Sequence, residues 1–275
     1  MASVRPQTEV GTTLREWRER RRLTQLDLAL EAGVSARHLS FVETGRSRPG
    51  RDKLRRIMRH LDVPFREQNR LLLAAGHAPV FPERSLDDSD LAPVHEALGL
   101  VLARHDPYPA VVVDRHWNLV AANSALLALT EGAHIDPDLL KPPINVLRLG
   151  LHPRGLAPLM VNLSEWRAHF RDRLERQVET MGDESLQALL EEIGSYPDSE
   201  NERDPDFVRA ESSVLGPLKV RAPDGNELSL LGMFATFDTP FEVTSSELAI
   251  ELLFPADRAT GNALQNLARN RRRKQ

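Results

Sequence analysis

The stretch Thr24–Gly45, TQLDLALEAGVSARHLSFVETG, decides the fold of the N-terminal part of this chain. It predicts two short helices joined by a tight turn. Ala29 supplies the small side chain that two steeply crossing helices need where they come closest, and Gly33 supplies the positive φ angle that the turn requires. Leu39 and Val42 lie three residues apart on the second helix and face the same interior. Together these residues predict a helix-turn-helix unit.

The residues around this unit predict an all-α domain of five helices over residues 1–77. Thr24 and Ser35 stand at N-cap positions, and Gly45 stands where a left-handed cap would end the second helix. The segment Thr13-Leu-Arg-Glu16 has the pattern of a capping box and is expected to open the first helix. Apolar residues at helical spacing predict two further helices before residue 77.

From about Thr13 to Ala75 the sequence resembles the XRE family of phage-repressor-like DNA-binding domains. In such domains the second helix of the motif enters the major groove of double-stranded DNA. Arg37 is expected to pair with a guanine, against the alternative of a solvated surface charge. Gln25 resembles the family residue that anchors a phosphate, and Arg46 and Arg48 are placed for backbone contacts. The full set of expected DNA-contacting residues is Gln25, Ser35, Ala36, Arg37, His38, Ser40, Phe41, Arg46 and Arg48.

The charge of the chain is divided between its two parts. Residues 1–77 carry a net charge of +7 and residues 78–275 carry −11, which gives the −4 of the 275-residue chain. A basic small domain before an acidic large one favours DNA binding by the first part alone, because the acidic part repels phosphates. Residues 261–275, which end in ARNRRRKQ, are interpreted as a basic C-terminal tail. A solvated, disordered end is favoured for it over a phosphate-seeking one.

The remaining sequence predicts a linker and a second domain. Residues 78–93 are rich in proline and acids and are interpreted as the linker, and residues 94–260 as an α+β domain. Thr244-Ser-Ser-Glu247 is interpreted as a capping box that starts the last helix of this domain, which ends near Asp257. Before it, the pattern predicts helices at 94–104, 163–181 and 186–193, a short helix capped by Asn123, and strands at 111–113, 117–121, 217–222 and 228–237.

Strand, polar turn, strand, then Ala122-Asn123 and a helix resembles the opening of a PAS domain, a small antiparallel sheet with helices folded over one face around a cavity. The whole order of segments resembles the MmyB-like transcription regulators. The residues that carry this resemblance are His38–Phe41, Pro107–Asp114, Asn145–Leu149, His152–Gly155, Glu165–Trp166 and Glu247–Asp257. It implies an XRE-type domain followed by a PAS-like domain that senses a ligand, and a fatty acid has been associated with that cavity.

A ligand with an apolar body and a carboxylate head needs one planar cation at the mouth of its pocket. Arg148 is the candidate for this cation, with Asn145 or His152 as a supporting donor. The alternative is that Arg148 pairs with an acidic side chain of its own domain. Trp166 and Phe170 belong to an apolar helical stripe that forms either the wall of a cavity or an ordinary core.

Other classes of protein find little support in the sequence. The chain has no cysteine, so disulfides and thiolate zinc sites are excluded, and its histidines lack the spacing of metal ligands. It shows no nucleophile elbow, phosphate loop or dinucleotide fingerprint, so we expect no enzyme and no cofactor beyond a bound lipid-like ligand. With no apolar run of membrane-spanning length and no signal-peptide pattern, we expect a cytoplasmic protein.

The leading hypothesis is therefore a ligand-responsive transcription regulator. Its expected partners are a DNA operator, a small apolar carboxylate and a second copy of the chain, since repressor-like domains usually act in pairs. The alternative makes the second domain a ligand-free module for dimerisation or protein docking. A third hypothesis, a lipid-processing enzyme, would need a nucleophile and a base that the sequence does not reveal.

Overall fold

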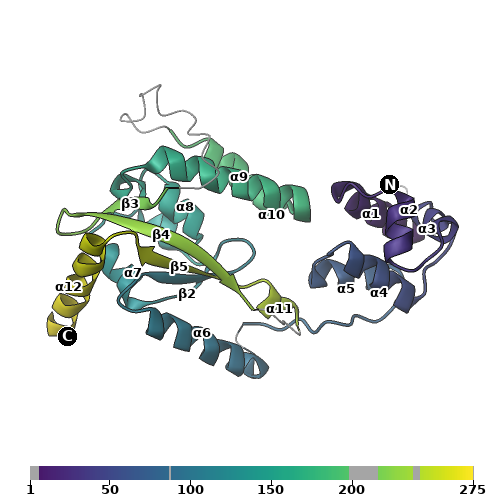
Figure 1. The fold of residues 1–275 in the computed structure, drawn as a ribbon, viewed down its shortest axis with the longest axis horizontal. Coiled ribbons are helices and arrows are strands. Elements are labelled where there is room, and N and C mark those ends of the chain that lie inside the picture. Colours follow the sequence, from purple (N-terminus) through teal and green to yellow (C-terminus); the bar gives the residue numbers. More distant parts are fainter. Residues whose placement is uncertain (1–5, 87, 198–215, 238–241, 275) are drawn as a thin grey trace. The chain divides into compact units, whose positions relative to one another are not determined.

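The computed structural model describes residues 6–86, 88–197, 216–237 and 242–274, and these form two compact units (Figure 1). The first unit consists of the described residues up to 86 together with 242–246. The second consists of the described residues between 88 and 237 and of 247–274. Each unit has its own hydrophobic core.

The first unit is the expected bundle of five helices: α1 (Pro6–Arg20), α2 (Gln25–Glu31), α3 (Ala36–Glu43), α4 (Arg51–His60) and α5 (Phe65–Ala74). Thr24 caps α2 in a capping box with Asp27, and Ser35 caps α3 by accepting a hydrogen bond from the His38 N–H. Gly33 and Gly45 adopt the positive φ angles, 61° and 69°, that the turn and the helix end need. The local signals of the helix-turn-helix are confirmed.

The start of α1 differs from the prediction. The helix begins at Pro6, so Thr13 lies in its interior and is not its N-cap. Val10, one turn before Leu14, is already buried, and this extends the apolar stripe toward the N-terminus. Gly11 lies where α1 meets the end of α3: a Cβ there would lie 2.6 Å from the Glu43 carbonyl oxygen and closer still to that of Val42. The contact of α1 with α3 therefore requires glycine at this position.

The first unit continues beyond the predicted boundary at residue 77. The Asn69 side chain accepts hydrogen bonds from the backbone N–H groups of Val80 and Phe81, and the Phe81 ring stacks on that of Phe65 at 3.9 Å. A short helix, α11 (Val243–Ser246), joins the unit through the Val243 N–H, which donates to the Pro82 carbonyl. Residues 78–86, which we assigned to the linker, are thus packed on the first unit.

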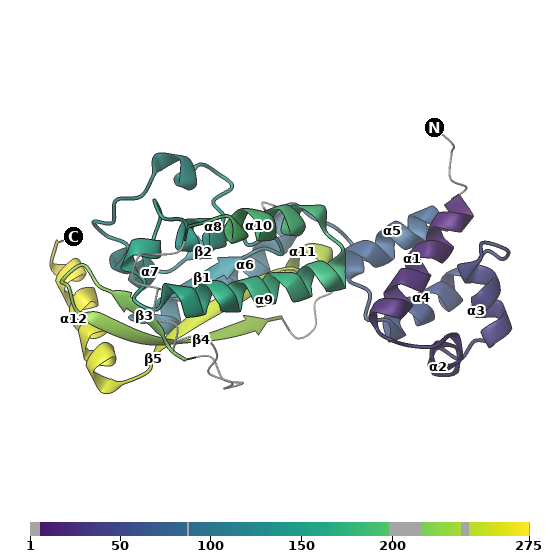
Figure 2. The ribbon, with the colours of Figure 1, turned by 90° about the horizontal axis from the view of Figure 1, so that it is seen from above.

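The second unit is built on a five-stranded antiparallel sheet in the order β2-β1-β5-β4-β3, which agrees with the PAS-like prediction. Its strands are β1 (Ala110–Val113), β2 (Leu119–Ala122), β3 (Leu218–Arg221), β4 (Glu227–Thr236) and β5 (Ala249–Pro255). The helices are α6 (Ala92–His105), α7 (Ser124–Leu129), α8 (Val146–Leu151), α9 (Leu163–Met181), α10 (Glu184–Gly194) and α12 (Arg258–Lys274). Helices α8, α9 and α10 cover one face of the sheet, and α6 lies on the other (Figures 1 and 2).

The end of the chain contradicts two predictions. The segment after Ser246 is not a helix but β5, the central strand, in which Ile250 pairs with Val112 of β1 and Leu252 with Met233 of β4. A short apolar run has no periodicity that separates a central strand from a helix, and long-range pairing decides. The expected disordered tail is the helix α12, because Leu264 is buried in the core of the second unit. In the part of the chain that the structure describes, no helix is long and apolar enough to span a membrane.

Candidate nucleic-acid interface and ligand site

A buried carboxylate ties α3 to the rest of the first unit. Glu43 at the end of α3 accepts hydrogen bonds from Arg18 of α1, at 2.8 Å from Nε and 3.0 Å from Nη2. The same carboxylate accepts a third from Gln25 Nε2 at 2.8 Å. This pairing holds the pKa of the Arg18 guanidinium above its ordinary value. Because α1, α2 and α3 meet at one carboxylate, α3 is held in a defined orientation.

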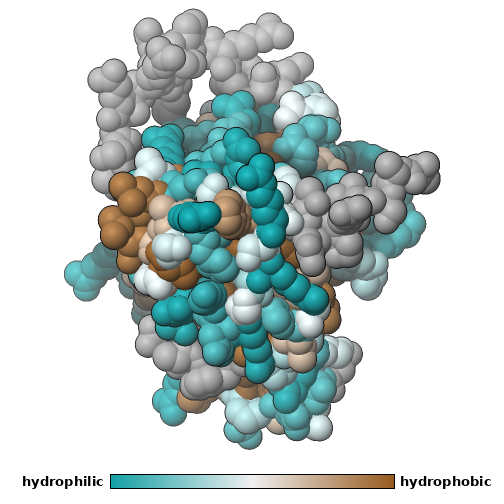
Figure 3. Space-filling model, turned by 90° about the vertical axis from the view of Figure 1, so that its right-hand side faces the viewer, coloured by the Kyte–Doolittle hydropathy of each residue, from teal (hydrophilic) through white to brown (hydrophobic). Residues whose placement is uncertain are grey.

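The outer side of α3 carries the residues predicted to read DNA. Arg37 is exposed, and its guanidinium carbon lies 5.4 Å from the centre of the Phe41 ring. Among the described residues it makes no hydrogen bond or salt bridge. Ala36, Ser40 and Phe41 are partly exposed beside it, and Arg46 is exposed in the loop that follows. Figure 3, which shows the molecule from the right-hand side of Figure 1, has hydrophilic side chains over much of the coloured surface and apolar patches among them. These side chains are free to meet a nucleic acid.

Three of the residues predicted to contact DNA have surroundings or contacts within the first unit, and their DNA contacts stay predictions. His38 is partly buried, and its Nε2 atom is enclosed without a hydrogen-bond partner among the described residues. Burial and the charge of Lys53 lower its pKa, so the ring is neutral near pH 7 and cannot neutralise a phosphate. Arg48 donates from Nε to the Ala75 carbonyl at 2.5 Å and joins the loop to the end of α5. Ser35 serves as the N-cap of α3 through its side chain.

Arg148, the predicted cation for a ligand carboxylate, pairs with an acidic side chain of its own domain. This is the alternative that the sequence analysis left open. Its Nε and Nη2 atoms donate to the two carboxylate oxygens of Glu192 at 2.7 and 2.6 Å. The Tyr196 hydroxyl donates to the same carboxylate, and the His152 ring packs edge-on against Tyr196. Asn145 caps α8 and donates to the His116 carbonyl. The predicted head-group residues therefore form a structural network.

The aromatic residues of the predicted ligand set do lie together. Trp166 and Phe170 on α9 are buried, and their rings pack 5.5 Å apart. The Trp117 ring meets Phe170 edge-on at 5.7 Å and Phe234 of β4 at 5.8 Å. Sequence reasoning missed Trp117 and Phe234, together with Arg173 and Glu251 beside them. Arg173 carried a signal, since it is a charged residue three positions beyond Phe170 on the inward side of α9.

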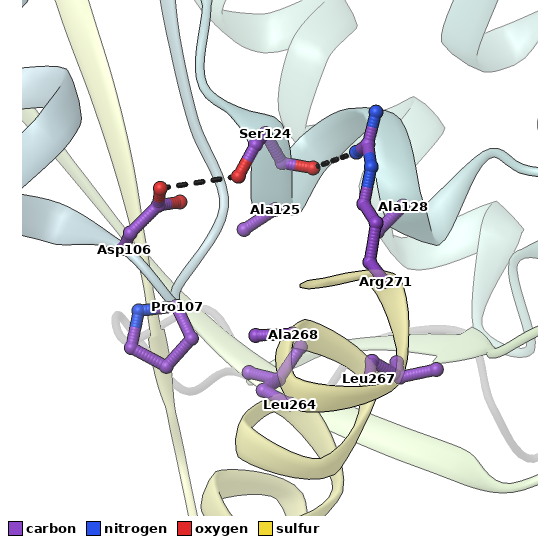
Figure 4. A pocket seen from close by; sticks show the side chains of 9 residues that line it. All are labelled: Asp106, Pro107, Ser124, Ala125, Ala128, Leu264, Leu267, Ala268 and Arg271. Atoms are coloured by element: carbon purple, nitrogen blue, oxygen red, sulfur yellow. Dashed lines mark hydrogen bonds between the residues drawn. The ribbon is translucent and has the colours of Figure 1, made fainter. Parts of the chain in front are cut away.

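A small pocket of about 140 Å³ lies elsewhere in the second unit, between α7, α12 and the turn before β1 (Figure 4). At its rim the Ser124 hydroxyl donates to Asp106, and Arg271 of α12 donates to the Ser124 carbonyl at 2.5 Å. Alanine and leucine side chains form its walls. Arg271 belongs to the segment predicted as a tail, so that segment contributes to the folded unit.

A helix-turn-helix domain followed by a PAS-like domain in the same chain is the domain arrangement of a class of transcription regulators. The model of the MmyB-like transcription regulator ligand binding domain matches residues 94–267, more than half of the chain, and a helix-turn-helix model matches residues 14–68. The chain belongs to the MmyB-like transcription regulators. This confirms the family that the sequence resembled.

Individual relatives match shorter stretches. The uncharacterized HTH-type transcriptional regulator RghRB of Bacillus subtilis (strain 168) is 36% identical over 81 residues. These residues are 29% of this chain and 56% of that protein, so the chain spans about half the length of this curated relative.

Two solved structures are similar at low TM-scores. The clp gene regulator ClgR from Corynebacterium glutamicum is 23% identical, over 38% of this chain and 99% of that one, with a TM-score of 0.24. An RNA-binding Light-Oxygen-Voltage receptor is 13% identical, over 98% of this chain and 64% of that one, with a TM-score of 0.28. The family assignment accordingly rests on the two family models.

Proposed function

We propose that this chain is a sequence-specific DNA-binding regulator in which α3 reads the major groove. The observation that carries this is the exposed Arg37–Phe41 pair on a helix whose end is fixed by Glu43. A guanidinium without a salt bridge in the described residues is available to donate two hydrogen bonds to a guanine, and an aromatic ring beside it packs on a thymine methyl. Arg46, exposed in the following loop, contacts the phosphate backbone in this proposal.

The test is a selection of randomised double-stranded DNA with the purified full-length chain. We expect enrichment of one motif, and two copies of it about one helical turn apart, because the proposed binding form is a homodimer. The matched control is the Arg37→Ala protein, which should lose preference at one base pair of each half-site. A wild-type protein that enriches no motif would overturn the proposal.

We further propose that the second unit binds a small apolar carboxylate of the fatty-acid type. The match to a ligand-binding domain family and the packed aromatic rings of Trp117, Trp166 and Phe170 support this. Binding would bias how the two DNA-reading units of a dimer are held, and so change the affinity for paired half-sites. The Arg148–Glu192 pair does not favour Arg148 as the residue that meets the carboxylate, since a ligand would have to displace Glu192.

Native mass spectrometry of the full-length chain tests this second proposal. A mass increment that organic extraction removes, and that matches a fatty acid, supports ligand binding. A bare mass that gains nothing on incubation with fatty acids contradicts it and favours a docking or dimerisation module.

A further inference from the structure

Resting on the ligand-binding role proposed above, we propose that Arg173 is the residue that receives the ligand carboxylate, with Glu251 beside it as a second contact. The two side chains come from α9 and from β5, the central strand of the sheet, on the face that α9 covers. We call the set Trp117, Arg173, Phe234 and Glu251 the Arg173 cluster.

Arg173 is a partly buried cation that has no anionic partner in hydrogen-bonding contact among the residues that the structure describes. Its guanidinium carbon lies 3.6 Å from the centre of the Phe234 ring and 4.9 Å from that of Trp117. Among the described residues it makes no hydrogen bond and no salt bridge. Burial lowers its pKa, which shows that its surroundings disfavour the charge. A guanidinium that lies over the Phe234 ring and beside Trp117 still carries five N–H donors in a planar fork, which suits a planar anion.

Glu251 faces this cation without pairing with it. Its charge and that of Arg173 attract each other. The structure describes both side chains, and they form no salt bridge with each other. Burial raises the pKa of Glu251 to about 7, so its carboxyl group carries a proton in much of the protein at neutral pH. A protonated carboxyl group donates a hydrogen bond, and a carboxylate ligand between the two residues would accept from both.

Gly232 leaves space beside Glu251. In β4 it stands between the buried Leu230 and the partly buried Phe234, and it is itself exposed. A Cβ there would lie 3.5 Å from Glu251 Oε1 and 3.7 Å from Trp166 Cη2. The Trp166 Nε1 atom is buried and finds no acceptor in the described residues, which leaves one further donor in this region without a partner.

This arrangement selects for a singly charged, planar head group. A phosphate would bring two charges next to Glu251, whereas a carboxylate accepts two hydrogen bonds from the arginine and can share the Glu251 proton. The surrounding rings and the neighbouring buried side chains of Trp166 and Phe170 supply apolar surface against which the chain of the ligand would pack in this proposal. The geometry therefore assigns to the Arg173 cluster the role that sequence reasoning gave to Arg148.

The experiment measures binding of a series of saturated fatty acids, from octanoate to stearate, and of the alcohols of equal length to the full-length protein. The wild-type protein should bind at least one acid about tenfold more tightly than its alcohol, equivalent to about 1.4 kcal/mol. Arg173→Met should remove this preference and leave the alcohol affinity as it was. Arg171→Met is the control, because Arg171 lies on the same helix with its side chain 55% exposed and should leave the preference unchanged.

A second pair of variants guards against a folding defect. Arg173→Lys keeps the charge but not the planar fork and should retain part of the preference. Glu251→Gln cannot ionise, so the fall in acid affinity that we expect as the pH rises through about 7 should disappear. The charged group that acts on Glu251 is Arg173. The residues that pair with Glu251 on the neighbouring strands, Val111 and Phe234, are apolar. His169 and Arg176 lie near Arg173.

The outcomes separate this inference from the proposed function. Acid binding that survives in a folded Arg173→Met protein overturns the Arg173 assignment and leaves ligand binding standing. Loss of the acid preference in Arg148→Met, with Arg173→Met unaffected, returns the role to Arg148. A wild-type protein that binds neither the acids nor the alcohols overturns the ligand-binding function itself, and this inference with it.

Discussion

Arg148 and Glu192 face each other as a two-pronged ion pair, Nε to Oε1 at 2.7 Å and Nη2 to Oε2 at 2.6 Å. The arginine comes from α8 and the glutamate from α10, so the pair joins two of the helices that cover the sheet. The Tyr196 hydroxyl donates to the same carboxylate, and burial together with this hydrogen bond raises the pKa of the phenol above its ordinary value. The pair is thus part of how α8 and α10 are packed.

Removing this pair should destabilise the second unit. Arg148→Met leaves Glu192 without its cation, and we expect a loss of about 1–2 kcal/mol, because both side chains are more than a third exposed and solvent screens the pair. Arg148 holds the pKa of Glu192 below its ordinary value. The contribution is therefore present above the unfolded pKa, near 4.5, and is lost as the pH falls through the lower pKa of the folded chain. Urea unfolding of both proteins at pH 7 and pH 3.5 checks this, and an equal difference at the two pH values would contradict it.

Arg37→Ala should weaken binding to the selected operator by about 1–3 kcal/mol and relax the preference at one base pair. Arg46→Ala, a change in the neighbouring loop, should instead weaken all sequences alike and lower the salt dependence, since it removes a phosphate contact. Titrations of matched and mismatched operators at several salt concentrations separate the two effects. Unchanged base preference in Arg37→Ala would mean that α3 lies on DNA in another register.

Gly11→Ala should destabilise the first unit by about 1–3 kcal/mol or more, because the new methyl group would meet backbone oxygens at the end of α3. Backbone cannot move aside as a side chain can. Gly99→Ala is the matched control: Gly99 is an exposed residue within α6 with open space around it. That change should stabilise by about 0.5–1 kcal/mol, the ordinary helix preference for alanine. Thermal unfolding followed by circular dichroism measures both, and equal signs would contradict the close contact of α1 with α3.

Glu251 should make the stability of the second unit fall as the pH rises from about 4.5 to about 7. Its pKa in the folded chain is raised to about 7 from an ordinary value near 4.5, so the folded state binds the proton more tightly. Stability is full below the unfolded pKa and declines until the folded pKa is passed, by at most about 3 kcal/mol. Glu251→Gln should flatten this slope. A slope that persists unchanged in the variant would assign it to other groups.

A fragment of residues 1–86 should fold as a helical domain and be more stable than a fragment of residues 1–77. The longer fragment retains the hydrogen bonds of Asn69 to Val80 and Phe81 and the stacking of Phe65 on Phe81. We expect a difference of about 1–3 kcal/mol, from one buried amide and one aromatic pair. Chemical unfolding of the two fragments measures it, and equal stabilities would place the boundary at 77 as the sequence predicted.

The sequence by itself determined the features that depend on neighbouring residues. Thr24 and Ser35 cap helices whose first N–H groups lie within three residues of them. Gly33 adopts the positive φ angle that the turn at this position requires, independently of the rest of the fold. The bounds of α9 follow likewise from its own apolar spacing and from the glycine at 182 that ends it. The order of these features along the chain was sufficient to recognise the family.

Only the tertiary structure decided what depends on residues far apart in the chain. The apolar run of β5 becomes a central strand because β1 pairs with it in the sheet, for example through Val111 and Glu251, which lie 140 residues apart in the chain. Arg148 pairs with Glu192, 44 residues further along the chain, whereas Arg173 makes no salt bridge with any described residue. Acidic side chains are plentiful in this domain, so charge alone could not pair them. The distances between folded elements made that selection, because an ion pair needs contact within a few ångströms.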